Sequence, residues 1–137
     1  MKKNVPITAL VSRSTFTVKP WDRLSRVYRL MKRHNLSHVP VVEADKIVGI
    51  ISRRDILHLG FGYAYEGRED VEIGIFDMLQ ADQVMVKNPA LVPLDAFVEE
   101  VAKLLATSEM LALPVIDRAS KVTGIIDVHQ VVLFLLE

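Results

Sequence analysis

The amino-acid sequence predicts an α/β fold, α+β in the stricter usage, made of two similar strand-helix-strand-strand-helix units. The main observation is an internal repeat, because Val11–Val42 aligns with Met85–Ile116 without a gap when the chain is displaced by 74 positions. One added turn residue brings Lys46 onto Lys121, and the alignment then continues to the C-terminus. An internal repeat fixes the unit of folding. The recurring residues are Val18, Val27, Leu30, Pro40, Val41, Gly49, Ile50 and Ile51, which return as Val92, Val101, Leu104, Pro114, Val115, Gly124, Ile125 and Ile126.

Composition is that of an ordinary globular protein, because half of the 137 residues are hydrophobic and a quarter are charged. One copy alone would bury too little surface to be stable, so the two copies are expected to share a core. The 17 basic and 17 acidic residues cancel, which argues against recruitment to nucleic acid or to an acidic membrane. The absence of cysteine excludes disulfides, thiolate metal sites and a cysteine nucleophile, and it fits a cytoplasmic protein.

The N-terminal residues do not form a signal peptide, because the apolar stretch after Met1–Asn4 is short and is interrupted by Pro6 and Arg13. No apolar run approaches the length that spans a bilayer.

The first copy begins with a predicted strand at Thr15–Val18, which ends before Pro20. Asp22 is expected to cap the helix that follows. That helix is predicted by apolar residues at i, i+3, i+4 and i+7, and Asn35 is expected to end it. The apolar stripe is Leu24, Val27, Tyr28 and Met31, and most of the basic residues between them fall on the other faces.

A hairpin follows in the first copy. The apolar runs Val39–Val42 and Lys46–Ile51 flank the polar, turn-like residues Glu43–Asp45. Ser52 then opens a second helix that carries Ile56.

The second copy repeats each element. Asp95 is expected to cap its first helix, and Leu113–Asp117 with Lys121–Ile126 form its hairpin. Asp127 is expected to begin the last helix. The predicted inward residues are Val98, Val101, Ala102 and Leu105 on the first helix, and Val131, Val132 and Leu135 on the last. Agreement between the copies strengthens each element.

Two segments carry a family resemblance. His38–Val42 reads His-Val-Pro-Val-Val, and Val48–Leu57 reads Val-Gly-Ile-Ile-Ser-Arg-Arg-Asp-Ile-Leu. This pattern, present in two tandem copies, resembles the CBS domain, named after cystathionine β-synthase. The resemblance implies two CBS repeats with pseudo-twofold symmetry, at residues 1–59 and 81–137, with an insert at 60–80. Such pairs are called Bateman modules, and they bind adenine nucleotides or adenosyl ligands.

The tetrad Ser52-x-x-Asp55 has two interpretations. The resemblance implies that Asp55 accepts hydrogen bonds from the two ribose hydroxyls of a ligand, supported by Ser52. The alternative is a helix cap, with Ser52 at the N-cap and Asp55 three residues later. The second copy departs from the family pattern, since Asp127 stands in the place of serine or threonine and Gln130 in the place of the ribose aspartate. We therefore expect one competent cleft and one impaired or repurposed cleft.

The resemblance implies further ligand-binding residues. Each cleft of the family combines the ribose motif of one repeat with the first strand and the pre-proline residue of the other. Val86, Lys87 and Ala112 would therefore join Ser52 and Asp55, although a solvated loop lysine remains an alternative for Lys87. His38 is a further candidate, because it occupies the position before the proline that lies near a phosphate in the family. Arg53 and Arg54 lie at a helix N-terminus, which either suits an anion or simply faces solvent.

His34 and His38 have the spacing of a metal pair, but the helix is expected to end between them, so no metal site is predicted.

The insert at 60–80 holds four of the six glycines and four of the nine aromatic residues, together with an acidic cluster. It is either a flexible linker or an ordered segment at the edge of the module, and we favour the ordered segment because of its aromatic content. Ile73–Gln80 could form a short helix.

The sequence thus indicates a regulatory module that senses an adenosine-containing ligand and signals through an effector protein. The candidate ligands are AMP, ADP, ATP, S-adenosylmethionine, NAD and a cyclic dinucleotide. No arrangement of catalytic residues is present, so an enzyme is not expected. A homodimer is expected through apolar helical faces that include Val131, Val132, Phe134 and Leu135, unless these residues belong to the core. The alternative function is a ligand-free dimerisation scaffold with vestigial clefts.

Overall fold

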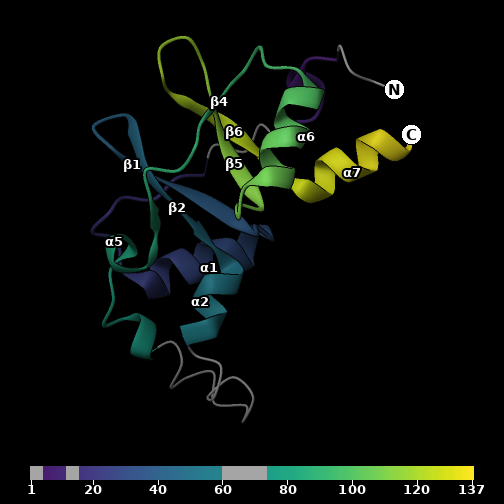
Figure 1. Ribbon diagram of the computed structural model, residues 1–137. Coiled ribbons are helices and arrows are strands. Elements are labelled where there is room, and N and C mark those ends of the chain that lie inside the picture. Colours follow the sequence, from purple (N-terminus) through teal and green to yellow (C-terminus); the bar gives the residue numbers. More distant parts are fainter. Residues whose placement is uncertain (1–4, 12–15, 60–73) are drawn as a thin grey trace. The chain divides into compact units, whose positions relative to one another are not determined.

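The computed structural model describes residues 5–11, 16–59 and 74–137 and divides the chain into two compact units. The first unit is Phe16–Asn88, and the second unit combines Met1–Thr15 with Pro89–Glu137. Each unit contains a three-stranded sheet and helices, as Figure 1 shows. The predicted α/β fold is therefore confirmed.

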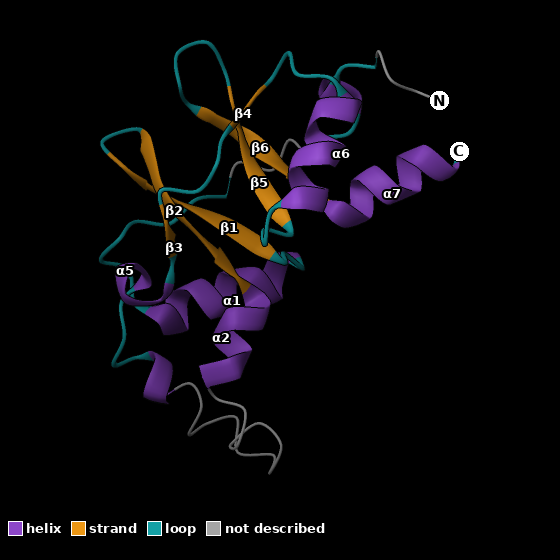
Figure 2. Cartoon of the chain, in the orientation of Figure 1, coloured by secondary structure: helices purple, strands orange, loops and turns teal. Residues whose placement is uncertain are grey.

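The first unit is built on a sheet of strand order β1-β2-β3. β1 and β2 form the predicted antiparallel hairpin, whose register shifts at Val41/Val42. Figure 2 shows α1 and α2 beside this hairpin. The elements are α1 (Leu24–His34), β1 (His38–Glu43), β2 (Lys46–Ser52), α2 (Arg53–Leu59), α5 (Ala81–Val84) and β3 (Val86–Lys87).

Helix α1 has the predicted apolar stripe and the predicted end. Its stripe is fully or nearly fully buried, and Asn35 ends it in the left-handed conformation with φ 52°. The predicted cap is wrong, because the N-cap residue is Arg23 and no side chain caps it. Asp22 instead accepts a hydrogen bond from the Lys19 N–H at 2.8 Å and pairs with Arg26 at 3.3 Å. Its carboxylate therefore stabilises the turn before the helix.

The second unit has the strand order β4-β5-β6, with β4 parallel to β5 and β5 antiparallel to β6. Its hairpin shifts register at Val115/Ile116, the same place in the repeat as in the first unit. The predicted cap at Asp95 is wrong, because Phe97 is the N-cap and Glu100 accepts its backbone N–H at 3.3 Å. The elements are η1 (Ile7–Ala9), β4 (Val92–Pro93), α6 (Val98–Thr107), β5 (Ala112–Ile116), β6 (Val122–Asp127) and α7 (Val128–Leu136).

Helix α7 is more exposed than predicted. Val131 is buried and Phe134 packs against the core of the second unit, but Val132 and Leu135 are exposed and do not point inward. Helix α7 has too many apolar residues for one buried face, because apolar side chains surround it. Its exposed apolar residues are Val132, Leu133, Leu135 and Leu136.

The predicted strand at Thr15–Val18 is reduced to an isolated parallel bridge between Val18 and Val41, while Thr15 lies outside the described residues. A Cβ atom at Gly49, which pairs with Lys87 of β3, would collide with the side chain of Met85. A larger residue at Gly49 would therefore require the Met85 side chain to move.

The chain at the start of each repeat packs on the first helix of the other repeat. In the first unit, Leu24 N–H donates to Leu79 at 2.8 Å, and Ala81 N–H donates to Asp22 at 2.9 Å. The second unit repeats both bonds 74 residues away, with Val98 N–H donating to Val5 and Ile7 N–H donating to Ala96, each at 2.9 Å. The compact units therefore divide the chain differently from the sequence repeats.

The described end of the 60–80 insert is part of the first core, whereas residues 60–73 lie outside the described residues. Residues 74–76 form a helical turn that places Phe76 against Tyr28, with ring centroids 5.4 Å apart. Asp77 accepts a hydrogen bond from the buried Ser25 hydroxyl at 2.5 Å. In the described part of the chain, no helix has the length and apolarity to cross a membrane.

Candidate functional site

Ser52 and Asp55 lie where β2 passes into α2. Ser52 is the last residue of β2, and its hydroxyl oxygen accepts the Asp55 backbone N–H at 2.9 Å. The capping interpretation of Ser52 therefore describes a real contact. The Asp55 carboxylate is exposed and makes no hydrogen bond or ion pair with any other described residue. Its two oxygens remain available as acceptors.

His38 lies directly beside this tetrad. It begins β1 and is the ladder partner of Ser52, so both side chains lie on the same face of the sheet. The His38 Nδ1 atom is 3.0 Å from the Ser37 hydroxyl, and the Ser37 carbonyl accepts the Arg53 N–H at 2.8 Å. A backbone hydrogen bond thus connects the residue before β1 to the first residue of α2.

Strand β3 brings a third segment to the same sheet. Val86 pairs with Ile50, which is two residues before Ser52, so Val86 shares the face of Ser52 and His38. Lys87 pairs with Gly49 and points to the opposite face. Arg53 and Arg54 occupy the first turn of α2, with Arg53 half-buried and Arg54 exposed.

In the second unit, the side chains of the matching tetrad, Asp127 and Gln130, make hydrogen bonds within the protein. Asp127 Oδ1 accepts the Gln130 N–H at 2.8 Å, and Gln130 Oε1 accepts the Asp127 N–H at 2.9 Å. Gln130 Nε2 also donates to the Leu10 carbonyl at 3.2 Å. Ala112 is buried and stands opposite Asp127, where His38 stands opposite Ser52 in the first unit. Gln130 is therefore committed to protein contacts at both ends of its amide.

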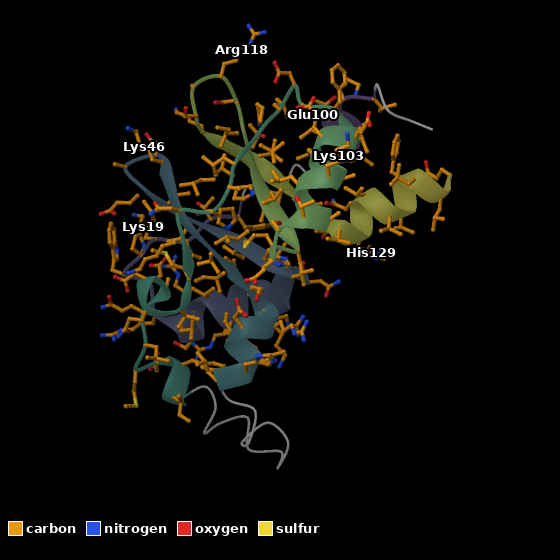
Figure 3. All side chains as sticks on the ribbon, in the orientation of Figure 1. Lys19, Lys46, Glu100, Lys103, Arg118 and His129 are labelled. Carbon is orange, nitrogen blue, oxygen red and sulfur yellow. The ribbon has the colours of Figure 1, made fainter. Side chains whose placement is uncertain are left out.

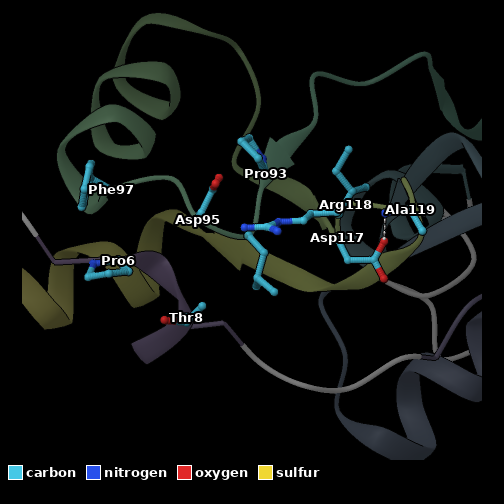
Figure 4. A pocket seen from close by; sticks show the side chains of 10 residues that line it. Pro6, Thr8, Pro93, Asp95, Phe97, Asp117, Arg118 and Ala119 are labelled. Atoms are coloured by element: carbon cyan, nitrogen blue, oxygen red, sulfur yellow. Dashed lines mark hydrogen bonds between the residues drawn. The ribbon is translucent and has the colours of Figure 1, made fainter.

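A cavity of about 820 Å³ lies in the second unit, and neither Asp127 nor Gln130 lines it. Figure 4 shows the Arg118 side chain reaching toward Asp95 across it. The described residues contain no bond between the Thr8 N–H and Leu94, although the matching Asp82 N–H donates to Pro20 at 2.9 Å in the first unit. This cavity was not predictable from the sequence, because its lining comes from three segments that are distant along the chain, at residues 6–8, 93–97 and 116–119.

The fold and the two tetrads define a tandem pair of CBS domains. The chain matches the CBS domain over residues 4–62 and again over 81–137, and it belongs to that family.

Three known proteins illustrate the similarity. The chain is 28% identical to the inosine-5'-monophosphate dehydrogenase of Korarchaeum cryptofilum over 90% of its own length and 23% of that enzyme. The CBS-pair protein CBSX2 from Arabidopsis thaliana superposes with a TM-score of 0.81 at 22% identity, covering 97% of this chain and 95% of that one. CBSX2 has also been solved in complex with AMP, with a TM-score of 0.75.

The third is the CBS domain pair of protein MJ0100, solved with 5'-methylthioadenosine and S-adenosyl-L-methionine. It has a TM-score of 0.75 at 20% identity and covers 96% of this chain and 95% of that one. The chain spans between 22% and 45% of the length of the first curated relatives that it matches.

Proposed function

We propose that the protein is a non-catalytic regulatory module that binds an adenosine-containing nucleotide at Ser52 and Asp55 of the first unit. The observation that carries the proposal is the contrast between the tetrads. The Asp55 carboxylate is exposed and unpaired among the described residues, whereas Gln130 is engaged by Asp127 and Leu10. One tetrad can therefore receive a ligand without breaking an internal contact.

The chemistry of the first tetrad suits a ribose. A carboxylate is an acceptor at both oxygens, so Asp55 can accept one hydrogen bond from each hydroxyl of a ribose diol. Hydrogen bonds to a charged acceptor are stronger than neutral ones, and a ligand without the diol would leave them unmade. Ser52 fixes the first turn of α2 through its bond to the Asp55 N–H. His38, Arg53 and Arg54 are the residues proposed to meet the phosphate.

The nucleobase is proposed to lie against the exposed apolar side chain of Val86, on the face of the sheet that carries Ser52. Support for an adenine ligand comes from the relatives, since CBSX2 has been solved with AMP and the MJ0100 pair with adenosyl compounds. The ligand would signal through an effector protein only if it binds one conformation of the module more tightly than another. Lys87 points to the opposite face of the sheet from Ser52, so it is not proposed as a contact of this ligand.

A thermal-shift panel tests the proposal. The purified chain is heated with AMP, ADP, ATP, S-adenosylmethionine, NAD and a cyclic dinucleotide, each over a concentration series. A ligand at a hundred times its Kd should stabilise the protein by about 2.7 kcal/mol, which raises the Tm by several degrees. Inosine monophosphate serves as the control for the adenine base, and deoxyadenosine monophosphate serves as the control for the ribose diol. If no ligand shifts the Tm, the nucleotide proposal fails and the scaffold function is favoured.

The alternative function, a homodimerisation scaffold, is favoured by one feature. Four apolar residues of α7 are exposed, and one of them, Leu136, is 78% accessible. Contiguous apolar surface of this kind typically marks an interface with another protein chain. A second copy of the chain is the proposed partner, with a twofold interface formed by α7 of each protomer.

Sedimentation equilibrium tests the dimer. We expect twice the chain mass for the unmodified protein and the single mass for Leu133→Glu, because a charge buried at an apolar interface is costly. Met78→Glu is the control, since Met78 is exposed in the first unit and lies outside α7. A monomer in the unmodified protein, or a dimer that survives Leu133→Glu, would contradict this interface.

A further inference from the structure

A second cavity, of about 370 Å³, lies in the first unit, on the outer side of α1. Arg26, Arg29 and Arg33 line it from one stripe of the helix, at i, i+3 and i+7. The opposite wall is the chain that precedes the helix, at Phe16, Thr17 and Val18. Three arginine side chains therefore line one small cavity.

These positive charges are poorly balanced by the protein itself. Helix α1 contains no acidic residue. Arg26 pairs with Asp22 at 3.3 Å through a mostly exposed side chain, while Arg29 and Arg33 have no acidic partner among the described residues. Arg29 and Arg33 are one helical turn apart, and like charges at that spacing destabilise a helix. An anion in the cavity would remove this repulsion.

The fold does not require this charge. The matching positions of α6, 74 residues later, hold Glu100, Lys103 and Thr107. Figure 3 labels Glu100 and Lys103 on that helix, where Lys103 also pairs with Glu99 at 3.4 Å. Among the described residues, the first copy therefore combines a cavity with three arginines, of which only Arg26 has an acidic partner.

Apolar groups close part of the cavity. Phe16 stacks on His34 with ring centroids 4.0 Å apart, and Leu30 lies between the arginines. The volume is in the range of small-ligand sites, and the chain has no net charge to attract a polymer such as RNA.

We propose that this arginine cavity binds a small, multiply charged phosphate anion, either free pyrophosphate or the diphosphate group of a nucleotide. Arginine is suited to this role, because its planar fork donates two parallel hydrogen bonds to phosphate oxygens. The site is separate from the ribose-binding tetrad, since it lies on α1 and uses neither Ser52 nor Asp55. It does not depend on the proposed nucleotide function.

Isothermal titration of the full chain with inorganic pyrophosphate, at constant ionic strength, tests this site. Arg29→Gln combined with Arg33→Gln is expected to weaken binding at least 10-fold, because bonds to two guanidinium groups are lost. Lys103→Gln is the matched control and should leave the affinity unchanged. Both variants change exposed side chains, so an unaltered Tm verifies folding. Binding that the double variant retains, or that Lys103→Gln weakens equally, would overturn the proposal, as would no binding of pyrophosphate.

Asp55→Ala separates this proposal from the nucleotide site. Pyrophosphate should bind Asp55→Ala as tightly as the unmodified chain, and a loss of binding there would overturn a separate arginine site. ADP added to Asp55→Ala distinguishes the two sources of the anion. Residual ADP binding that requires Arg29 and Arg33 identifies a nucleotide diphosphate, whereas its absence beside intact pyrophosphate binding identifies the free anion.

Discussion

Replacing Phe76 with alanine is expected to lower the free energy of unfolding by about 3–5 kcal/mol. Phe76 has no exposed surface and packs its ring against Tyr28 in the core of the first unit. Truncation would remove a large buried apolar surface and leave a cavity between α1 and the chain before α5. Urea unfolding followed by circular dichroism measures the loss.

Met78 offers a matched control two residues further on, because 76% of its surface is exposed. Met78→Ala is expected to change the free energy of unfolding by no more than about 0.5 kcal/mol. If the two substitutions cost the same, Phe76 does not belong to the core that the structure assigns to it. A large difference would establish that the end of the 60–80 segment is essential to the first unit.

The second large effect concerns ligand binding, and it should separate the two tetrads. Asp55→Ala is expected to weaken binding of the nucleotide found in the panel by about 10–100-fold, since charge-assisted bonds to the ribose are lost. Gln130→Ala should leave that affinity unchanged, because Gln130 serves Asp127 and Leu10. Titration calorimetry on both variants measures the two affinities.

The free energy of unfolding without ligand should respond in the opposite way, with the larger loss in Gln130→Ala. Gln130→Ala removes half of a capping box and a bond to Leu10, which is expected to cost about 1 kcal/mol. Asp55→Ala removes no contact among the described residues, so its effect on the Tm without ligand should be small. A loss of nucleotide affinity in Gln130→Ala that equals the loss in Asp55→Ala would contradict the assignment of the site to the first unit.

The hairpins and the inner faces of α1 and α6 were predictable, because each depends on a local pattern of apolar residues, a run in the strands and a helical spacing in the helices, that both copies carry. The caps were not. Asp22 and Asp95 each stand before an apolar stripe, as a capping residue would, but the helices begin at Leu24 and Val98, two and three residues later. A single residue type before a helix does not fix the position of the N-cap.

The inner and outer sides of α7 were not predictable, since apolar residues occur around the whole helix and give its periodicity little direction. The role of Gln130 depends on Leu10, which is 120 residues away and has no recognisable pattern. The arginines of α1 carry a clearer sequence signal than their position on the outer faces of the helix. No acidic residue balances them within Leu24–His34, whereas the second copy has Glu99 and Glu100.

The segment around Ile7 packs in the unit of the second repeat, and the segment around Ala81 packs in the unit of the first repeat. One compact unit is therefore inserted within the other along the chain. The first unit is one continuous stretch, Phe16–Asn88, and the second unit is formed by what precedes and follows it. The first unit is therefore an insertion within the second. A cut between the repeats, before Ala81, would remove α5 and β3 from the first unit and would leave the second without Ile7. Cuts at 15/16 and 88/89 would instead release a continuous fragment with its complete sheet.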